Sequence, residues 1–132
     1  MLLTDKSVDR KKTLLIIDDE DLNFFSLAAM LKSKGYACLS ANGTGEALTV
    51  LRTTPEMDAI LMDIMMPGLD GFETTRLIKE EPPFDSIPII ALTALTTNDV
   101  KEKALASGAV AFLTKPVDVD LLLAKLEELI AD

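Results

Sequence analysis

The sequence contains no histidine and no tryptophan, and Cys38 is its only cysteine. A zinc site built from histidine and cysteine is therefore excluded, and no disulfide can form within the chain. We expect Cys38 to be a reduced, buried thiol. No apolar run approaches the roughly 20 residues that span a bilayer, and the opening segment 4–7 lacks the apolar core of a signal peptide. These absences predict a cytoplasmic protein with no membrane partner.

Basic residues are also scarce, with 13 lysines and arginines against 22 acidic residues and a formal charge of −9. Residues 1–12 are rich in basic side chains, which makes the rest of the chain still more acidic. Nonspecific binding to DNA or to anionic lipids relies on basic patches that neutralise phosphates. We therefore expect no direct nucleic-acid partner. For most of these charges, the alternative is that acidity serves only solubility.

What is present indicates one folded domain. Apolar residues make up 48% of the 132 residues and charged residues 27%, which is typical of a soluble globular protein. We expect residues 1–12 to form a flexible arm and residues 13–132 to form the domain. Most of the apolar runs in this region are continuous rather than alternating, which is typical of strands in a parallel sheet covered on both faces. The predicted strands are residues 14–17, 36–39, 59–62, 87–92 and 110–113.

Stretches of helical length separate these strands, and the last one carries an apolar stripe at helical spacing. We expect Asp118 to cap this last helix, and Thr97 or Asn98 to cap the helix before it. Gly35 and Gly108 stand where helices are expected to end. The stripe consists of Val119, Leu122, Leu123, Leu126 and Ile130.

Five strands alternating with five helices predict an α/β fold with a doubly wound, five-stranded parallel sheet, because parallel strands need long crossover connections. Ligands of such sheets bind at the carboxyl ends of the strands. Asp18 and Asp19 directly follow the first predicted strand, and Asp63 follows the third. Three carboxylates at one edge repel each other unless a cation neutralises them, and hard oxygen ligands suit Mg²⁺. Taken singly, an aspartate in a loop is more often a solvated cap or turn residue, but three at matching strand ends favour a site.

Two further polar residues follow predicted strands at the same edge, Thr93 and Lys115. A lysine offers a compact positive charge to a phosphoryl oxygen, and a threonine hydroxyl can donate a hydrogen bond to another. Phosphoryl transfer needs little more than a nucleophile, alignment and charge stabilisation. Asp63 is the central candidate nucleophile and would form an acyl phosphate. The alternative for Lys115 is an ordinary surface salt bridge.

Four segments together resemble the motifs of response-regulator receiver domains, in order and in spacing. The resemblance covers about residues 12–131 and implies a flavodoxin-like fold. The segments are Leu14-Leu15-Ile16-Ile17-Asp18-Asp19-Glu20, Leu61-Met62-Asp63-Ile64-Met65-Met66-Pro67-Gly68-Leu69-Asp70-Gly71, Ala91-Leu92-Thr93-Ala94 and Thr114-Lys115-Pro116.

The resemblance implies a role for each residue that would bind the metal ion or the phosphoryl group. Asp63 would be the phosphoacceptor and would also ligate Mg²⁺. Asp19 would ligate the metal directly, Asp18 through a metal-bound water, and Met65 through its backbone carbonyl. Lys115 would contact the phosphoryl group, and the peptide bond from Lys115 to the following proline would be cis.

The resemblance also implies a switch. Thr93 would move toward the phosphoryl group, and Phe112 would respond by moving inward. The readout would be a change on the face formed by the fourth helix, the fifth strand and the fifth helix. Simple core packing is the alternative role for Phe112. Many relatives have tyrosine there, so this chain lacks the hydroxyl that could bond in the inward state.

In relatives, polar side chains at the positions of Met65 and Leu95 help water attack the phosphoryl group. Both residues are apolar here and can neither orient nor activate a water molecule. We therefore predict a relatively long-lived phosphorylated state.

Because the chain has no histidine, it cannot be the phosphohistidine donor and must receive the phosphoryl group. We expect the donor to be a histidine kinase or a histidine phosphotransfer protein, and the output to go to a downstream effector protein. The protein would be a signalling module and not an enzyme. Met1 favours a complete small protein, whereas the receiver of a hybrid sensor kinase or a phosphorelay shuttle would look the same.

Three alternatives from other classes remain, two of them remote and the third, a pseudoreceiver, a more serious rival. A Mg²⁺-dependent aspartyl-phosphate phosphatase normally has a second aspartate where this chain has Met65. A nucleotide switch needs a glycine-rich loop after the first strand, whereas this chain has acidic residues there. A pseudoreceiver that only binds partners usually lacks one of the five site residues, and all five are present: Asp18, Asp19, Asp63, Thr93 and Lys115.

Overall fold

The computed structural model describes residues 11–18, 21–66, 69–94 and 97–130. Most of the expected arm, residues 1–12, lies outside these ranges, and so do Asp19 and Leu95. Five parallel strands form one sheet in the order β2-β1-β3-β6-β7, which confirms the predicted doubly wound topology. The strands are β1 (Thr13–Ile17), β2 (Ala37–Ala41), β3 (Met57–Asp63), β6 (Ile89–Thr93) and β7 (Ala111–Thr114).

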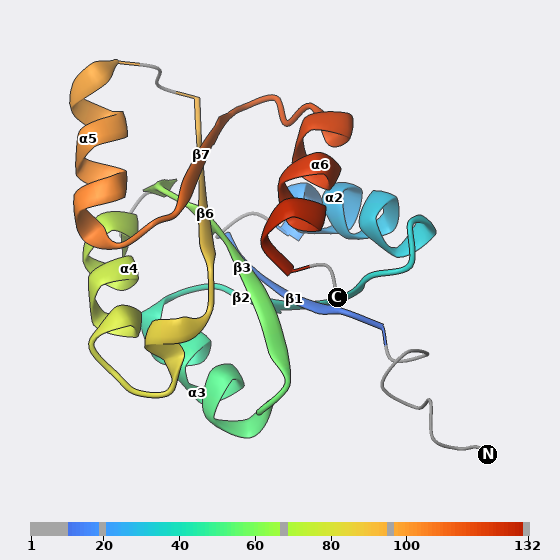
Figure 1. Ribbon diagram of the computed structural model, residues 1–132, viewed down its shortest axis with the longest axis horizontal. Helices are drawn as coiled ribbons and strands as arrows, with labels where there is room; N and C mark the ends of the chain where they lie inside the picture. Colours follow the sequence, from blue (N-terminus) through green and yellow to red (C-terminus); the bar gives the residue numbers. More distant parts are fainter. Residues whose placement is uncertain (1–10, 19–20, 67–68, 95–96, 131–132) are drawn as a thin grey trace.

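Five helices flank this sheet, as predicted. Helices α2 and α6 cover one face, and α3, α4 and α5 cover the other (Figure 1). None of the helices in the described ranges is long and apolar enough to cross a membrane. The helices are α2 (Asp21–Ser33), α3 (Thr44–Thr53), α4 (Gly71–Lys79), α5 (Asn98–Ser107) and α6 (Val119–Ile130).

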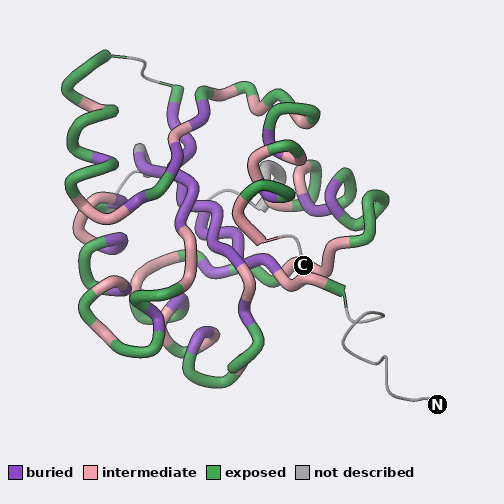
Figure 2. Tube along the Cα trace, viewed as in Figure 1, coloured by how far each residue is buried: buried purple, intermediate pink, exposed green. Residues whose placement is uncertain are grey.

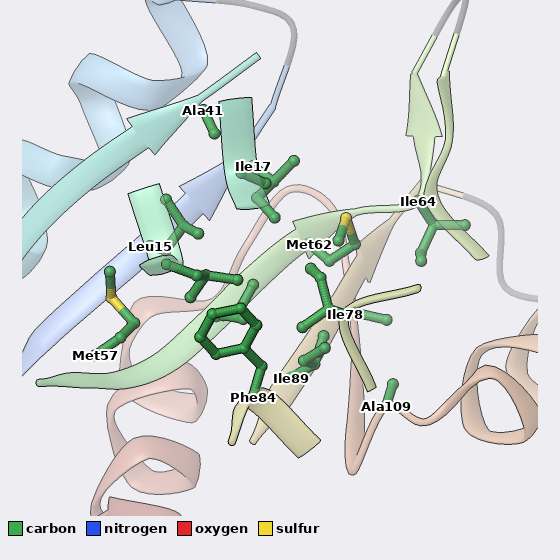
Figure 3. Close-up of a cluster of buried hydrophobic side chains, with 14 of the residues drawn as sticks. Leu15, Ile17, Ala41, Met57, Met62, Ile64, Ile78, Phe84, Ile89 and Ala109 are labelled. Atoms are coloured by element: carbon green, nitrogen blue, oxygen red, sulfur yellow. The ribbon is translucent and has the colours of Figure 1, made fainter. Parts of the chain in front are cut away.

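Alternate residues of each central strand enter two separate cores. Along β1, Leu15 and Ile17 pack beneath α3, α4 and α5, whereas Leu14 and Ile16 pack beneath α2 and α6. Figure 2 shows the resulting band of buried residues through the middle of the molecule, and Figure 3 shows part of the core on the α3, α4 and α5 side. Burial on both faces explains why these strands read as continuous apolar runs.

Several strands begin or end one or two residues away from the prediction. Residue 36 is excluded from β2 because its backbone N–H bonds to the carbonyl of Leu31, at the end of α2. Ser40, Thr93 and Thr114 belong to strands although they are polar, because backbone pairing continues past the apolar run. The apolar pattern alone marks burial rather than the extent of the hydrogen-bonded ladder.

The predicted helix signals are confirmed. The Thr97 hydroxyl accepts a hydrogen bond from the Val100 N–H at 3.4 Å, and an Asp118 carboxylate oxygen accepts one from the Leu121 N–H at 3.2 Å. Gly108 ends α5 with φ of 122°, a conformation that side chains disfavour.

Three features of the fold were not predicted. Residues 65–66 (β4) and 69–70 (β5) form a small antiparallel pair directly after β3. A short 3₁₀ helix, η1 (Phe84–Ser86), precedes β6. The peptide bond between Pro82 and Pro83 is cis.

Candidate functional site

Two carboxylates lie at the carboxyl edge of the sheet because β1 and β3 are neighbours in register. Ile17 pairs with Met62, so the next residues, Asp18 and Asp63, leave the two strands at the same level. Only 8% of Asp18 and 4% of Asp63 is exposed. The structure therefore brings together two of the three aspartates that the sequence singled out.

Lys115 supplies the positive charge at this edge. Its Nζ donates a hydrogen bond to Oδ2 of Asp63 at 2.6 Å and lies 3.8 Å from Oδ2 of Asp18. The backbone N–H of Lys115 bonds to the carbonyl of Thr93 at 2.8 Å, and the following peptide bond to Pro116 is cis, as expected. The lysine thus reaches the carboxylates from the end of β7.

Thr93 ends β6, the strand between β3 and β7, and is fully buried. Asp63 pairs with Leu92, so Thr93 lies one residue beyond the level of the phosphoacceptor candidate. Four of the five predicted side chains, those of Asp18, Asp63, Thr93 and Lys115, therefore occupy one edge of the sheet. Asp19, the fifth, lies outside the described residues.

The composition of this edge suits a hard divalent cation. Two buried carboxylates face one lysine ammonium, so the described part of the site carries more negative than positive charge. In the described ranges no group of three acidic, histidine or cysteine side chains could hold a metal. The side-chain candidates for binding a cation among the described residues are therefore the two carboxylates. The backbone carbonyl of Met65, which begins β4 two residues after Asp63, is a third candidate ligand. Carboxylate and carbonyl oxygens are the ligands that Mg²⁺ prefers.

A cavity of about 500 Å³ opens beside these residues, between α2 and the segment that connects β7 to α6. Its polar lining residues are Asp18, Ser26 and Lys115, and Leu27, Met30 and Val117 contribute apolar surface. The carboxylate edge is therefore reached from an open, partly apolar depression.

The proposed switch residue Phe112 lies in the middle of β7 and is half-buried. Its ring packs against the core beneath α3, α4 and α5, and the ammonium of Lys101 on α5 lies 5.7 Å from the ring centroid. Phe112 therefore contributes to core packing, the alternative considered for it, and touches α5 at the same time.

The sequence reasoning missed the cap of α4. Asp70 accepts hydrogen bonds from the backbone N–H groups of Phe72 at 2.9 Å and Glu73 at 3.2 Å. An aspartate directly before a helix start is a recognisable N-cap signal and could have identified it. This cap fixes where α4 begins, next to the segment that leaves Asp63.

Residues 14–127 match the family of response regulator receiver domains. Protein PilH of Pseudomonas aeruginosa is 36% identical over 118 residues, which cover 89% of this chain and 97% of PilH. The chain also resembles the receiver domain of sensor histidine kinase PA1611 from Pseudomonas aeruginosa, solved with a magnesium ion in its active site cleft. That structure has a TM-score of 0.79 and 31% identity, and the match covers 93% of this chain and all of the other.

A third relative is the receiver domain of Ssk1 from Saccharomyces cerevisiae, solved with the histidine phosphotransfer protein Ypd1. It has a TM-score of 0.80 and 29% identity, and the match covers 90% of this chain and 88% of the other. The chain therefore belongs to the response regulator receiver domains, the phosphoryl-accepting signalling modules of two-component systems. The flavodoxin-like fold implied by the sequence motifs is confirmed.

Proposed function

We propose that Asp63 is the residue that accepts the phosphoryl group. The observation that carries this proposal is the contact of 2.6 Å between Oδ2 of this nearly buried carboxylate and the Lys115 ammonium, beside Asp18. A carboxylate held at a strand end with a fixed cation next to it is arranged for attack on phosphorus and for stabilising the transferred charge.

In the proposed reaction, a carboxylate oxygen of Asp63 attacks the phosphorus of a phosphohistidine on a partner protein. The new P–O bond forms as the P–N bond breaks, and the leaving imidazole keeps the electron pair of that bond and is protonated. Lys115 would then contact an oxygen of the phosphoryl group, and the hydroxyl of Thr93 would donate to another. These two groups would hold the added charge of the acyl phosphate.

The donor set favours Mg²⁺ as the cofactor, and a related receiver holds magnesium in its active site cleft. Asp19, Asp63 and the carbonyl of Met65 would bind the ion directly, and Asp18 through water. The ion would neutralise charge that develops on the transferred group. The residues described at this edge fit that role because two of these carboxylates are nearly buried beside a single ammonium.

The readout would pass from Thr93 to Phe112 and α5. Attraction of Thr93 toward the phosphoryl group would shift the segment after β6, which leads into α5. Phe112 and Lys101 connect β7 to the same helix, so the face formed by α5, β7 and α6 would differ between two states.

The donor would be a histidine kinase or a histidine phosphotransfer protein, by analogy with the receiver solved with Ypd1. The output would go to a downstream effector protein, without direct contact to nucleic acid or a membrane, in the cytoplasm. Residues 13–132 would form the receiver domain and would not act as an enzyme. A second candidate, the receiver of a hybrid sensor kinase or a phosphorelay shuttle, is favoured by the likeness to a kinase receiver.

Incubation with Mg²⁺ and acetyl phosphate, followed by intact-mass measurement, tests the proposal. We expect wild type to gain one phosphoryl group and Asp63→Asn to gain none. Asp58→Asn is the matched control, because Asp58 lies at the opposite end of the same strand, away from the site, where it accepts a hydrogen bond from the backbone N–H of Thr13. No adduct on wild type, or an adduct of equal amount on Asp63→Asn, would overturn the assignment.

A further inference from the structure

Gly71, the first residue of α4, lies against the backbone of Asp63, the candidate phosphoacceptor, and of Ile64, the next residue. A Cβ atom at this position would be 2.7 Å from Cα of Ile64, and 2.9 Å from the carbonyl oxygens of both Asp63 and Ile64. Cβ atoms in real proteins essentially never come this close to a non-bonded neighbour, and all three neighbours belong to the backbone rather than to a side chain that could turn away. A residue larger than glycine therefore has to move either α4 or the Asp63–Ile64 segment.

The start of α4 resists such a movement. Asp70 caps the helix, the Thr75 hydroxyl donates to the carbonyl of Gly71 at 2.8 Å, and Thr75 itself is fully buried. One turn further along, Ile78 is fully buried in the core shown in Figure 3. The helix is thus held by hydrogen bonds at its start and by packing near its end.

The Asp63–Ile64 segment is held by the sheet, where the Ile64 N–H bonds to the carbonyl of Leu92 at 2.9 Å. Beyond Ile64, β4 pairs with β5 rather than with the large sheet. Met65 lies in this short connection between the two held parts. Separating α4 from Asp63 would pull on this connection and so would shift the Met65 carbonyl relative to the Asp63 carboxylate.

We propose that Gly71 is a positioning residue for the cation site: its missing side chain lets α4 lie on the Asp63–Ile64 backbone and so sets the distance between two oxygen ligands. The inference rests on the proposed function, because it takes Asp63 and the Met65 carbonyl as ligands of Mg²⁺. Gly71 itself touches neither the ion nor the phosphoryl group in this role.

The test measures the dissociation constant of Mg²⁺ by calorimetric titration, below the melting temperature of each variant. We expect Gly71→Ala to bind Mg²⁺ about tenfold to 100-fold more weakly than wild type, the range found when a residue that orients metal ligands is changed. The matched control is Gly45→Ala, since Gly45 lies in the first turn of α3 and a Cβ there meets nothing within 4 Å. That variant should bind Mg²⁺ as wild type does.

A second control separates positioning from general destabilisation. Leu51→Ala removes a buried side chain from α3, a helix that supplies no proposed ligand, and should lower the melting temperature without changing the affinity for Mg²⁺. If Gly71→Ala is unfolded in buffer, the titrations are repeated in trimethylamine N-oxide, which favours the folded state. A folded Gly71→Ala with the affinity of wild type, or an equal loss of affinity in Leu51→Ala, overturns the inference.

The outcome for wild type distinguishes this inference from the function on which it rests. If wild type binds Mg²⁺ and is phosphorylated on Asp63 while Gly71→Ala binds equally well, only the role of Gly71 is refuted. If wild type binds no Mg²⁺, the proposed cation site is refuted as well.

Discussion

The interior of the sheet and its carboxyl edge differ sharply in what they bury. Before that edge, the buried side chains of β1, β3 and β6 are all apolar, and Leu14, Leu61 and Ile90 are completely inaccessible. At the edge, Asp18, Asp63 and Thr93 are buried as well, although all three are polar. The transition takes place within one residue on each strand.

The apolar interior stabilises the fold, whereas the polar edge carries the groups suited to chemistry. Burying apolar side chains lowers the free energy of the folded state, whereas burying carboxylates raises it unless a charge or hydrogen bonds compensate. At the edge the compensation comes partly from Lys115. We infer that the polar edge is retained for phosphoryl transfer and the apolar interior for holding its strands in register. Four substitutions can break or sharpen this comparison.

The largest effect should come from the interior. Leu61→Ala deletes a fully buried side chain of the central strand and should lower the free energy of unfolding by about 2 to 5 kcal/mol, measured by urea denaturation. Leu39→Ala on edge strand β2 is the control, since Leu39 is 39% exposed, and should cost much less. A folded Leu61→Ala should still be phosphorylated. Equal costs at the two positions would contradict the comparison.

Next is Lys115→Ala at the edge. Removing the ammonium that touches Asp63 should slow phosphorylation by acetyl phosphate by about 100-fold, the typical cost of losing one positioned donor. The control is Lys125→Ala on α6, whose lysine forms a surface pair with Glu128 at 3.6 Å. The rate of gain of the phosphoryl group by intact mass measures both. A wild-type rate for Lys115→Ala would remove this lysine from the mechanism.

A smaller effect is predicted for decay of the phosphorylated state. Met65→Asn introduces an amide that can orient a water molecule, so it should shorten the lifetime of the phosphoaspartate by about tenfold, less than a true general base contributes. The lifetime is measured after removal of the phosphoryl donor. Rapid decay in wild type that Met65→Asn leaves unchanged would show that apolar residues here do not protect the acyl phosphate.

The smallest effect concerns Cys38 on the edge strand β2. Partial burial raises the pKa of its thiol above the ordinary value, and nearby Lys32 opposes this only in part. A raised pKa in the folded state means stability that is complete below the pKa of the unfolded chain and is lost as the pH rises through the folded pKa. Wild type should therefore lose slightly more stability than Cys38→Ala above the ordinary thiol pKa of 9.0.

Urea denaturation at several pH values measures this difference. Alkylation by iodoacetamide gives a second readout and should be slower for folded protein than for protein in urea, because only the thiolate reacts. If the free energy of unfolding depends on pH in the same way for wild type and Cys38→Ala, the raised pKa of the Cys38 thiol is refuted. Cys38 is a free thiol, as expected, but it is only half-buried rather than buried.

The order of the elements could be predicted from the sequence because burial on both faces leaves continuous apolar runs, as in residues 14–17. The site could be predicted because polar residues that directly follow parallel strands must meet at one edge. Strand ends could not be predicted to the residue, since Thr93 and Thr114 are polar yet pair within the sheet. The short β4 and β5 pair was missed because two-residue strands leave no periodic pattern.

The sequence by itself determined the fold class, the family, and the chemical identity of the groups at the edge, because these depend on residue type and order along the chain. Only the tertiary structure decided that Lys115 contacts Asp63 more closely than Asp18, and that α4 begins against the backbone of Ile64. The first contact joins residues 52 positions apart in the chain, and the second brings the start of α4 back onto the end of β3. Their distances depend on how helices pack on the sheet, which no local pattern of residues records.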